Sequence, residues 1–302
     1  MQFSLPKTFH FFFQLITFVK PIRKKIELQS GNGRCQRTNQ AGTCMTNDYK
    51  LEICANSVAS CLEAQKGGAY RVELCVAIPE GGTTPSYGDI ALARELLKIK
   101  LNVIVRPRGG DFLYSPLEQQ IMRKDIEIAR QLGADGVVIG CLTAEGEVDM
   151  IRNRELIEAA KGMSVTFHRA FDMCRDPFGS LERIIGLGCD RILTSGQQPR
   201  AEQGIGLLKQ LVEKAGDRII IMPGSGVNAQ NIARIAAATG ARELHLSARE
   251  PVESGMTYRN PNLKMGGEAV IIDEYSQQVT GAEIVRSTLL ALNVEKESNY
   301  QQ

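Results

Sequence analysis

Two short segments near the start of the chain share a pattern that brings acids and thiols together. Leu51-Glu52-Ile53-Cys54 and Val72-Glu73-Leu74-Cys75 each alternate aliphatic with polar residues. Side chains alternate faces along a β-strand, so one face of each segment carries a glutamate and a cysteine. If the two strands are parallel neighbours, two carboxylates and two thiols share one surface, and we expect the chemistry of this protein there.

Two of the three histidines fit the same pattern. Thr166 and His168 alternate with aliphatic or aromatic neighbours, and His245 lies between Leu244 and Leu246. An imidazole beside a carboxylate can act as a general acid or base. We expect either His168 with Glu52 or His245 with Glu73 to do this work. The candidate catalytic residues are therefore His168, His245, Glu52, Glu73 and Arg106.

The elements that must position these residues recur as a regular unit: a short apolar run, a loop, then an amphipathic helix. The predicted strands are Leu51–Ala55, Arg71–Val76, Asn102–Arg106, Gly136–Gly140, Ser164–His168, Arg191–Ser195, Arg218–Met222 and Glu243–Ser247. The predicted helices are Ser57–Lys66, Gly88–Lys98, Leu117–Leu132, Ile151–Ala160, Phe178–Leu187, Glu202–Ala215 and Ala229–Thr239. Glycines at six helix-to-strand joins are typical of left-handed helix ends.

Eight such units predict a closed parallel TIM (β/α)8 barrel, whose active site lies on the loops after the strands. The alternative is an open doubly wound sheet, which normally has a glycine-rich phosphate loop after its first strand. Here that loop reads Ala55-Asn56-Ser57, which favours the barrel.

Alternation also predicts which polar side chains meet at the barrel mouth. They are Glu52, Cys54, Glu73, Cys75, Arg106, Arg108, Thr166, His168, Glu243, His245 and Ser247. Unpaired charge is costly in a barrel interior, which branched aliphatic residues ordinarily fill. A structural interpretation stays open for Glu52, Glu73 and Arg106, which could belong to a neutralised network of three glutamates and two arginines.

Loops after the later strands could bind an anion. Glycine lets backbone amides approach an anion closely, and barrel enzymes often hold phosphate on the loops after strands seven and eight. The candidate binding residues are Arg108, Ser195, Gly196, Gly224 and Gly226. A small anionic or phosphorylated substrate would fit such loops. The residues do not choose between isomerisation, aldol-type cleavage and hydrolysis.

Composition narrows the setting. The net charge of +2 gives no basic footprint for nucleic acid, and no nucleotide motif or membrane-spanning segment is recognisable. The eight cysteines are Cys35, Cys44, Cys54, Cys61, Cys75, Cys141, Cys174 and Cys189. Their scatter, without a Cys-x-x-Cys, indicates a reducing compartment and mostly structural thiols.

The first 44 residues lie outside the repeating pattern. Their apolar run, residues 11–19, is too short to span a bilayer, and residues 29–43 have a polar composition typical of disorder. We expect residues 1–44 to be an extension without a fold of its own, as a start codon assigned too far upstream would produce, and residues 45–302 to form one barrel domain. A weak export or membrane-association signal is the alternative.

Several unbroken motifs resemble the CutC family, whose members are named for copper homeostasis. They are Leu51-Glu52-Ile53-Cys54, Arg71-Val72-Glu73-Leu74-Cys75, Glu80-Gly81-Gly82-Thr83-Thr84-Pro85-Ser86, Arg106-Pro107-Arg108-Gly109-Gly110-Asp111-Phe112, Thr166-Phe167-His168-Arg169-Ala170-Phe171-Asp172-Met173, Leu193-Thr194-Ser195-Gly196 and Tyr258-Arg259. The resemblance runs from about Leu51 to Leu292. It implies a TIM barrel, a cytoplasmic setting, a homodimer or higher homo-oligomer, and Cu(I) binding through cysteines that fall on Cys54 and Cys75.

Thiolate is a ligand type that selects Cu(I), and neighbouring strands lie close enough for two cysteines to share an ion. Two alternatives remain open for Cys54 and Cys75: small core residues, or a pair near disulfide distance. A helix predicted over Asp273–Leu292 would seal one end of the barrel or contact a second subunit.

Overall fold

The computed structural model describes residues 49–260, 262 and 273–299 of the 302-residue chain. All of them belong to the larger of the two units into which the chain divides, Asn47–Gln302. The predictions made for residues 1–44 fall outside the described residues and stay predictions.

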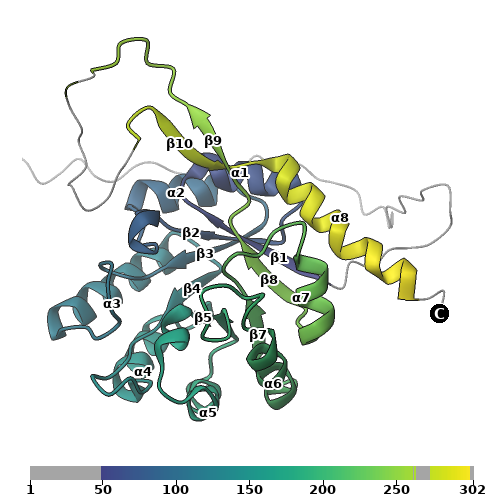
Figure 1. Cartoon of the computed structure of the whole chain (residues 1–302). Helices are drawn as coiled ribbons and strands as arrows, with labels where there is room; N and C mark the ends of the chain where they lie inside the picture. The colour runs from purple at the N-terminus through teal and green to yellow at the C-terminus, as the bar shows by residue number, and fades with distance from the viewer. Residues whose placement is uncertain (1–48, 261, 263–272, 300–302) are drawn as a thin grey trace, which may run out of the picture. The chain divides into compact units, whose positions relative to one another are not determined.

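Eight parallel strands form the predicted barrel, with helices around it (Figure 1). The strands are β1 Lys50–Ala55, β2 Arg71–Leu74, β3 Lys100–Ile104, β4 Gly136–Ile139, β5 Ser164–Phe167, β6 Arg191–Thr194, β7 Ile220–Pro223 and β8 Glu243–Leu246. Their order is β7-β6-β5-β4-β3-β2-β1-β8, so the first strand pairs with the last. No backbone ladder joins β7 to β8 in the described residues, but a Cβ added at Gly224 would lie 3.3 Å from the Cβ of His245. The barrel is thus nearly closed.

The predicted helices follow the strands. They are α1 Val58–Gly67, α2 Tyr87–Leu96, α3 Pro116–Gln131, α4 Met150–Ala159, α5 Pro177–Leu187, α6 Ile205–Ala215 and α7 Ile232–Thr239, with two short 3₁₀ helices, η1 Ile78–Glu80 and η2 Arg169–Met173. Side chains of Ser57, Ser86 and Ser115 cap the first three. Gly68 and Gly188 end α1 and α5 at φ of 95° and 84°, where a side chain would be strained.

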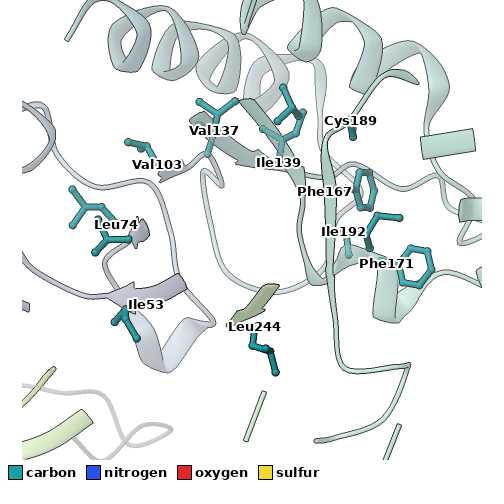
Figure 2. Close-up of a cluster of buried hydrophobic side chains, with 14 of the residues drawn as sticks. Ile53, Leu74, Val103, Val137, Ile139, Phe167, Phe171, Cys189, Ile192 and Leu244 are labelled. Carbon is teal, nitrogen blue, oxygen red and sulfur yellow. The ribbon is translucent and has the colours of Figure 1, made fainter. Parts of the chain in front are cut away.

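Alternation along the strands divides the residues into two sets. Aliphatic and aromatic side chains such as Ile53, Leu74, Val137, Phe167 and Leu244 are fully buried between the strands and the helices. Figure 2 shows them around the strand ring, pointing away from its centre. The intervening residues face the barrel interior. There a small apolar cluster forms from Cys75, Ile104 and Val138, with Cys54 and Ile78 against it.

The C-terminal segment differs from its prediction. The predicted helix over Asp273–Leu292 starts too early, because Ser276–Thr280 is strand β10, which pairs antiparallel with β9, Arg249–Glu253. Helix α8 begins only at Ala282 and runs to Asn299, and its Val285 packs into the core. The apolar spacing in the first half of α8 indicated a helix. Strand β10 could not be predicted in this way, because it forms by pairing with β9, which is distant in sequence.

In the described residues, no helix is long and apolar enough to cross a bilayer.

Candidate functional site at the barrel mouth

A buried ion network lies at the N-terminal end of the barrel interior. The Nε of Arg71 donates to Glu52, and its Nη2 donates to Glu243 at 2.7 Å. Arg191 reaches the same Glu243 oxygen at 3.1 Å, and Lys50 reaches the other at 3.4 Å. Burial alone would raise the pKa of Glu52, but Arg71 and then His245 outweigh it and hold that pKa at about 2. Glu52 and Glu243 are therefore paired anions.

The structural network expected from sequence exists, but with other arginines. Arg106 was the expected partner, and instead it donates to the carbonyl oxygens of Glu80, Gly82 and Gly110 at 2.7–3.0 Å. It thereby ties the loop after β2 to the loop after β3. Arg71 could have been found, because it precedes Glu73 by two residues and so shares its face.

His245 connects this network to the thiols. Its Nδ1 lies 2.7 Å from Glu52, and its Nε2 lies 3.7 Å from Glu73. The expected pairing of Glu52 with His168 was wrong: Glu52 bonds to His245 and Arg71. Since Nδ1 donates to an ionised carboxylate, Nε2 is the nitrogen turned toward Glu73 and Cys54.

The protonation of this pair reflects its burial. Burial opposes a charge on His245, yet hydrogen bonding with Cys54 and Glu52 and the nearby Glu73 carboxylate raise its pKa well above 6.5. Burial raises the pKa of Glu73 above the usual 4.5. Both shifts favour the protonated form of the group, and an imidazole beside a carboxyl group is an arrangement suited to acid–base work.

The two cysteines lie together, as the strand pattern predicted. Their sulfur atoms are 3.5 Å apart, and all six cysteines of the described residues are free thiols. The hydrogen bond with Cys75, and then burial, raise the pKa of Cys54 above its usual 9.0. The Sγ of Cys54, a carboxylate oxygen of Glu73 and a ring nitrogen of His245 all lie within 4.8 Å of one another.

This donor set fits a soft metal ion. Two metal–sulfur bonds of about 2.3 Å placed end to end are longer than the 3.5 Å sulfur separation, so both sulfurs can reach one ion. His245 and Glu73 would then be the nearest further donors, since both lie within 4.8 Å of the Cys54 sulfur. The carboxylate of Glu52 would fix the His245 ring, as outer partners of metal-binding histidines commonly do.

His168 lies apart from these groups, at the end of β5. Its Nδ1 accepts a hydrogen bond from the amide of Ala170 at 3.2 Å, so the neutral ring carries its proton on Nε2. That Nε2 is buried and has no partner in the described residues. The centroid of the His168 ring lies 4.9 Å from that of Phe112. The guanidinium carbon of Arg106 lies over the same Phe112 ring, 5.1 Å from its centroid. Burial, and then Arg106, lower the pKa of His168 to about 3.

The neutral His168 predicts an acid-sensitive fold. In the unfolded chain the pKa of His168 is near 6.5, so below pH 6.5 the unfolded chain binds a proton that the folded protein does not. The unfolding free energy is therefore unaffected above pH 6.5 and decreases as the pH falls toward 3. His168→Asn, which keeps an acceptor for the Ala170 amide, should remove this dependence. Between pH 7 and 4 we expect the wild-type unfolding free energy to fall by about 3 kcal/mol more than that of the variant. Parallel urea-unfolding curves across this range would contradict the assignment.

Other buried polar atoms also lack partners in the described part of the chain. They are Glu73 Oε1, Asn102 Nδ2, Thr166 Oγ1, Arg106 Nε and Arg249 Nε, together with Tyr114 Oη and Ser180 Oγ. The first five lie on the strands and strand ends that face the interior or its mouth. Unpartnered buried polar atoms indicate a bound water, ligand or functional role.

The candidate anion residues are spread over three loops. Arg108 lies at the surface, where its guanidinium binds Glu118 at 2.6 Å and Asp111 at 3.0 Å. The Ser195 amide and hydroxyl and the Gln197 amide bind the carboxylate of Asp172, and the Gly196 amide binds Thr194 Oγ1. A protein carboxylate therefore already occupies the donors after β6.

The loop after β7 is different. Gly224 donates its amide to the Thr194 carbonyl, but the amides of Ser225, Gly226 and Val227 bond to nothing in the described residues. Ser225 and Gly226 both have positive φ, 80° and 70°. The side chain of Arg200 lies against this turn, 3.1 Å from where a Cβ of Gly226 would be. Arg200 comes from an irregular loop, so no periodic signal in the sequence marked it.

Two further residues were missed. Asp172 accepts hydrogen bonds from Thr194 at the end of β6 and from Ser195 and Gln197 in the loop after it, and Arg249 donates to Cys54 at 3.5 Å. Asp172 stands inside a quoted motif, but its partners depend on the fold of a 3₁₀ helix. Arg249 follows a turn at Ala248 with a φ of 47°, which strand alternation cannot extend across.

Comparisons with known proteins agree on one family. A profile described as the CutC family matches residues 49–250. A CutC family protein of Bacteroides thetaiotaomicron is 62% identical over 245 residues, covering 81% of this chain and 98% of its own. The copper homeostasis protein cutC homolog of Homo sapiens is 43% identical over 265 residues, covering 88% and 93%.

Solved structures give the same answer. A CutC structure from Streptococcus agalactiae matches with a TM-score of 0.63 and 38% identity, covering 65% of this chain and 97% of its own. Thiamine phosphate pyrophosphorylase from Pyrococcus furiosus, at a TM-score of 0.52 and 16% identity, covers 82% of this chain and 97% of its own and shares only the fold. The profile match and these identities, over nearly the full length of the relatives, place the chain in the CutC family of copper homeostasis proteins.

Proposed function

We propose that the barrel mouth binds one Cu(I) ion between Cys54 and Cys75. The observation that carries the proposal is the 3.5 Å separation of the two sulfurs, beside ring and carboxylate donors within 4.8 Å of Cys54. Soft thiolate ligands select Cu(I) and Zn(II) over hard ions such as Mg²⁺ and Ca²⁺. The family name, copper homeostasis, supports the same ion.

The surrounding residues would hold and orient these ligands. Cys54 lies on β1, and Cys75 follows β2 directly, where its amide donates to the Ala55 carbonyl, so little ordering accompanies binding. His245, fixed by Glu52, would offer its Nε2 as a third ligand, and Glu73 would accept a displaced proton. Because the ion replaces thiol protons and the pKa of Cys54 is raised, affinity should increase with pH.

A Cu(I) titration of the reduced protein tests the proposal. Cys35→Ser and Cys44→Ser should be present throughout, because these thiols lie outside the described residues and could bind copper independently. With a competing chelator we expect one tightly bound Cu(I) per chain. Copper loading should also protect Cys54 and Cys75 from alkylation while leaving the labelling of Cys174 unchanged. No uptake, or protection elsewhere, would contradict the assignment.

A second candidate function is catalysis on a small anionic or phosphorylated substrate. The specific observation is the turn of Ser225, Gly226 and Val227, with its unbonded amides beside Arg200. It follows β7, where barrel enzymes often bind phosphate. His245 and Glu73 would serve as acid and base, and the Nε2 proton of His168 would donate to a substrate oxygen.

Inorganic phosphate tests this anion site. Crystals soaked in phosphate should show the ion on the amides of Gly226 and Val227, and Arg200→Gln should remove it. Arg108→Gln serves as the matched control, since the carboxylates of Glu118 and Asp111 already occupy that guanidinium. The absence of phosphate density at the loop after β7, or density there that Arg200→Gln does not remove, would contradict this anion site.

Two properties of the setting are also proposed: a cytoplasmic location and a homo-oligomeric assembly. Free thiols are usual in a reducing compartment. Leu117 and Ile151, at the starts of α3 and α4, are 67% and 71% exposed and could pack against a second copy. Light scattering on purified protein should report at least a dimer; a monomer at micromolar concentration would contradict the assembly.

A further inference from the structure

Arg249 lies beyond the eight barrel strands in the sequence, yet its side chain contacts the Cys54–Cys75 thiol pair. It is the first residue of β9, and its Nη2 donates to the Sγ of Cys54 at 3.5 Å. Its Nε is buried and unpartnered. The guanidinium is thus directed at the same sulfur that we assign to copper.

The β9–β10 hairpin holds Arg249 in this position. The Gly281 amide binds the Ala248 carbonyl at 2.9 Å, and Thr280 binds the Ser247 carbonyl at 3.1 Å. On the other side, the Asn56 amide group donates to the Gln278 carbonyl at 2.7 Å. In Figure 1 the hairpin lies beside α1, above the ends of the strands. Arg249 is therefore fixed by contacts to both β1 and β8 loops.

In the part of the chain that the structure describes, no carboxylate pairs with the charge of Arg249. The interior arginines Arg71 and Arg191 both face Glu243, whereas Arg249 forms no salt bridge with any carboxylate in the described residues. An unbalanced cation beside a buried thiol pair makes net negative charge at the sulfurs favourable.

The charge balance then differs between metals. Two thiolates with a monovalent ion leave a complex of charge −1, whereas two thiolates with a divalent ion are neutral. We propose that Arg249 is the counter-charge that makes the Cys54–Cys75 site select Cu(I) over divalent ions such as Zn(II). This inference rests on the proposed copper function. Arg249 acts as a specificity-determining residue through the ligand, not as a ligand itself.

Separate Cu(I) and Zn(II) titrations test the inference, in the Cys35→Ser, Cys44→Ser background with a chelator suited to each ion. Arg249→Met should weaken Cu(I) binding by about 10- to 100-fold, as loss of an outer partner of a metal ligand does, while leaving Zn(II) affinity unchanged or higher. Arg249→Lys should restore most of the Cu(I) preference. Arg242→Met removes an exposed cation at the opposite end of β8 and should change neither affinity.

The outcomes separate the two proposals. If the wild-type protein takes up no Cu(I) at these thiols, the copper function itself fails. If it does, and Arg249→Met keeps the wild-type ratio of Cu(I) to Zn(II) affinity, only the role of Arg249 is overturned. A general loosening of the hairpin would weaken both ions alike and would also overturn it. Should Arg249→Met not fold, Arg249→Gln takes its place.

Discussion

Replacing Cys54 and Cys75 together by serine is expected to lower Cu(I) affinity at least about 1,000-fold. Structural Zn(II) sites with four ligands, taken as a guide, have apparent binding free energies of about 10 to 16 kcal/mol, or roughly 3 kcal/mol for each ligand. Losing two thiolates therefore corresponds to more than four decades if the contributions add, and three is a conservative expectation. A serine hydroxyl keeps its proton at neutral pH and is a hard ligand, so it does not replace the sulfur.

The matched control is a second pair of buried thiols. Cys174→Ser with Cys189→Ser removes two buried free thiols that bond to neither Cys54 nor Cys75 in the described residues, and Cu(I) affinity should stay within about twofold of wild type. Competition with a chelator of known affinity measures the Cu(I) affinity of both double variants. Equal losses in the two double variants, or retained binding in the first, would show that copper does not depend on the Cys54–Cys75 pair.

Arg71→Met is expected to cost about 3 to 5 kcal/mol of unfolding free energy at pH 7. Arg71 is the main attraction that offsets the burial of Glu52, which is 1% exposed, and it also binds Glu243. Removing one member of a buried ion network leaves charge without compensation, and costs of this size follow. Met has a comparable length, so the loss of packing is small.

The pH dependence gives this prediction a sign. With Arg71 present, the pKa of Glu52 is about 2, so its stabilisation is present above pH 4.5 and is lost as the pH falls toward 2. Without Arg71 the pKa rises, so the deficit of the variant should shrink in acid. Arg218→Met is the control, because its pair with Glu182 is nearly half exposed and such pairs contribute at most about 1 kcal/mol. If Arg71→Met and Arg218→Met lowered the unfolding free energy in urea equally, the buried ion network would contribute no more to stability than an exposed pair.

The repeat of apolar runs and glycine-ended helices was sufficient to predict the barrel. Strand alternation also placed Cys54, Cys75, Glu73 and His245 together, because a period of two residues is a local property. Alternation could not say which charges would pair: Arg71 and Arg106 both point inward, and only the strand registers put Arg71 between Glu52 and Glu243.

Residues outside the strands were harder to predict. Arg249 reaches Cys54 only because Ala248 turns the chain and β10 anchors β9, and these contacts join residues distant in sequence. The glycine and serine of the loop after β6 indicated an anion site, but the amides of that loop donate to the Asp172 carboxylate. Sequence reasoning counts donors in a loop, but it does not reveal which acceptor of the same chain will use them.

The most direct test is the anomalous diffraction of crystals loaded with Cu(I) under reducing conditions. We expect one strong copper peak per chain, bonded to the sulfurs of both Cys54 and Cys75, with the His245 ring still held by Glu52. A peak at any other cysteine, a peak bonded to only one of the two sulfurs, or no peak at the barrel mouth would contradict it.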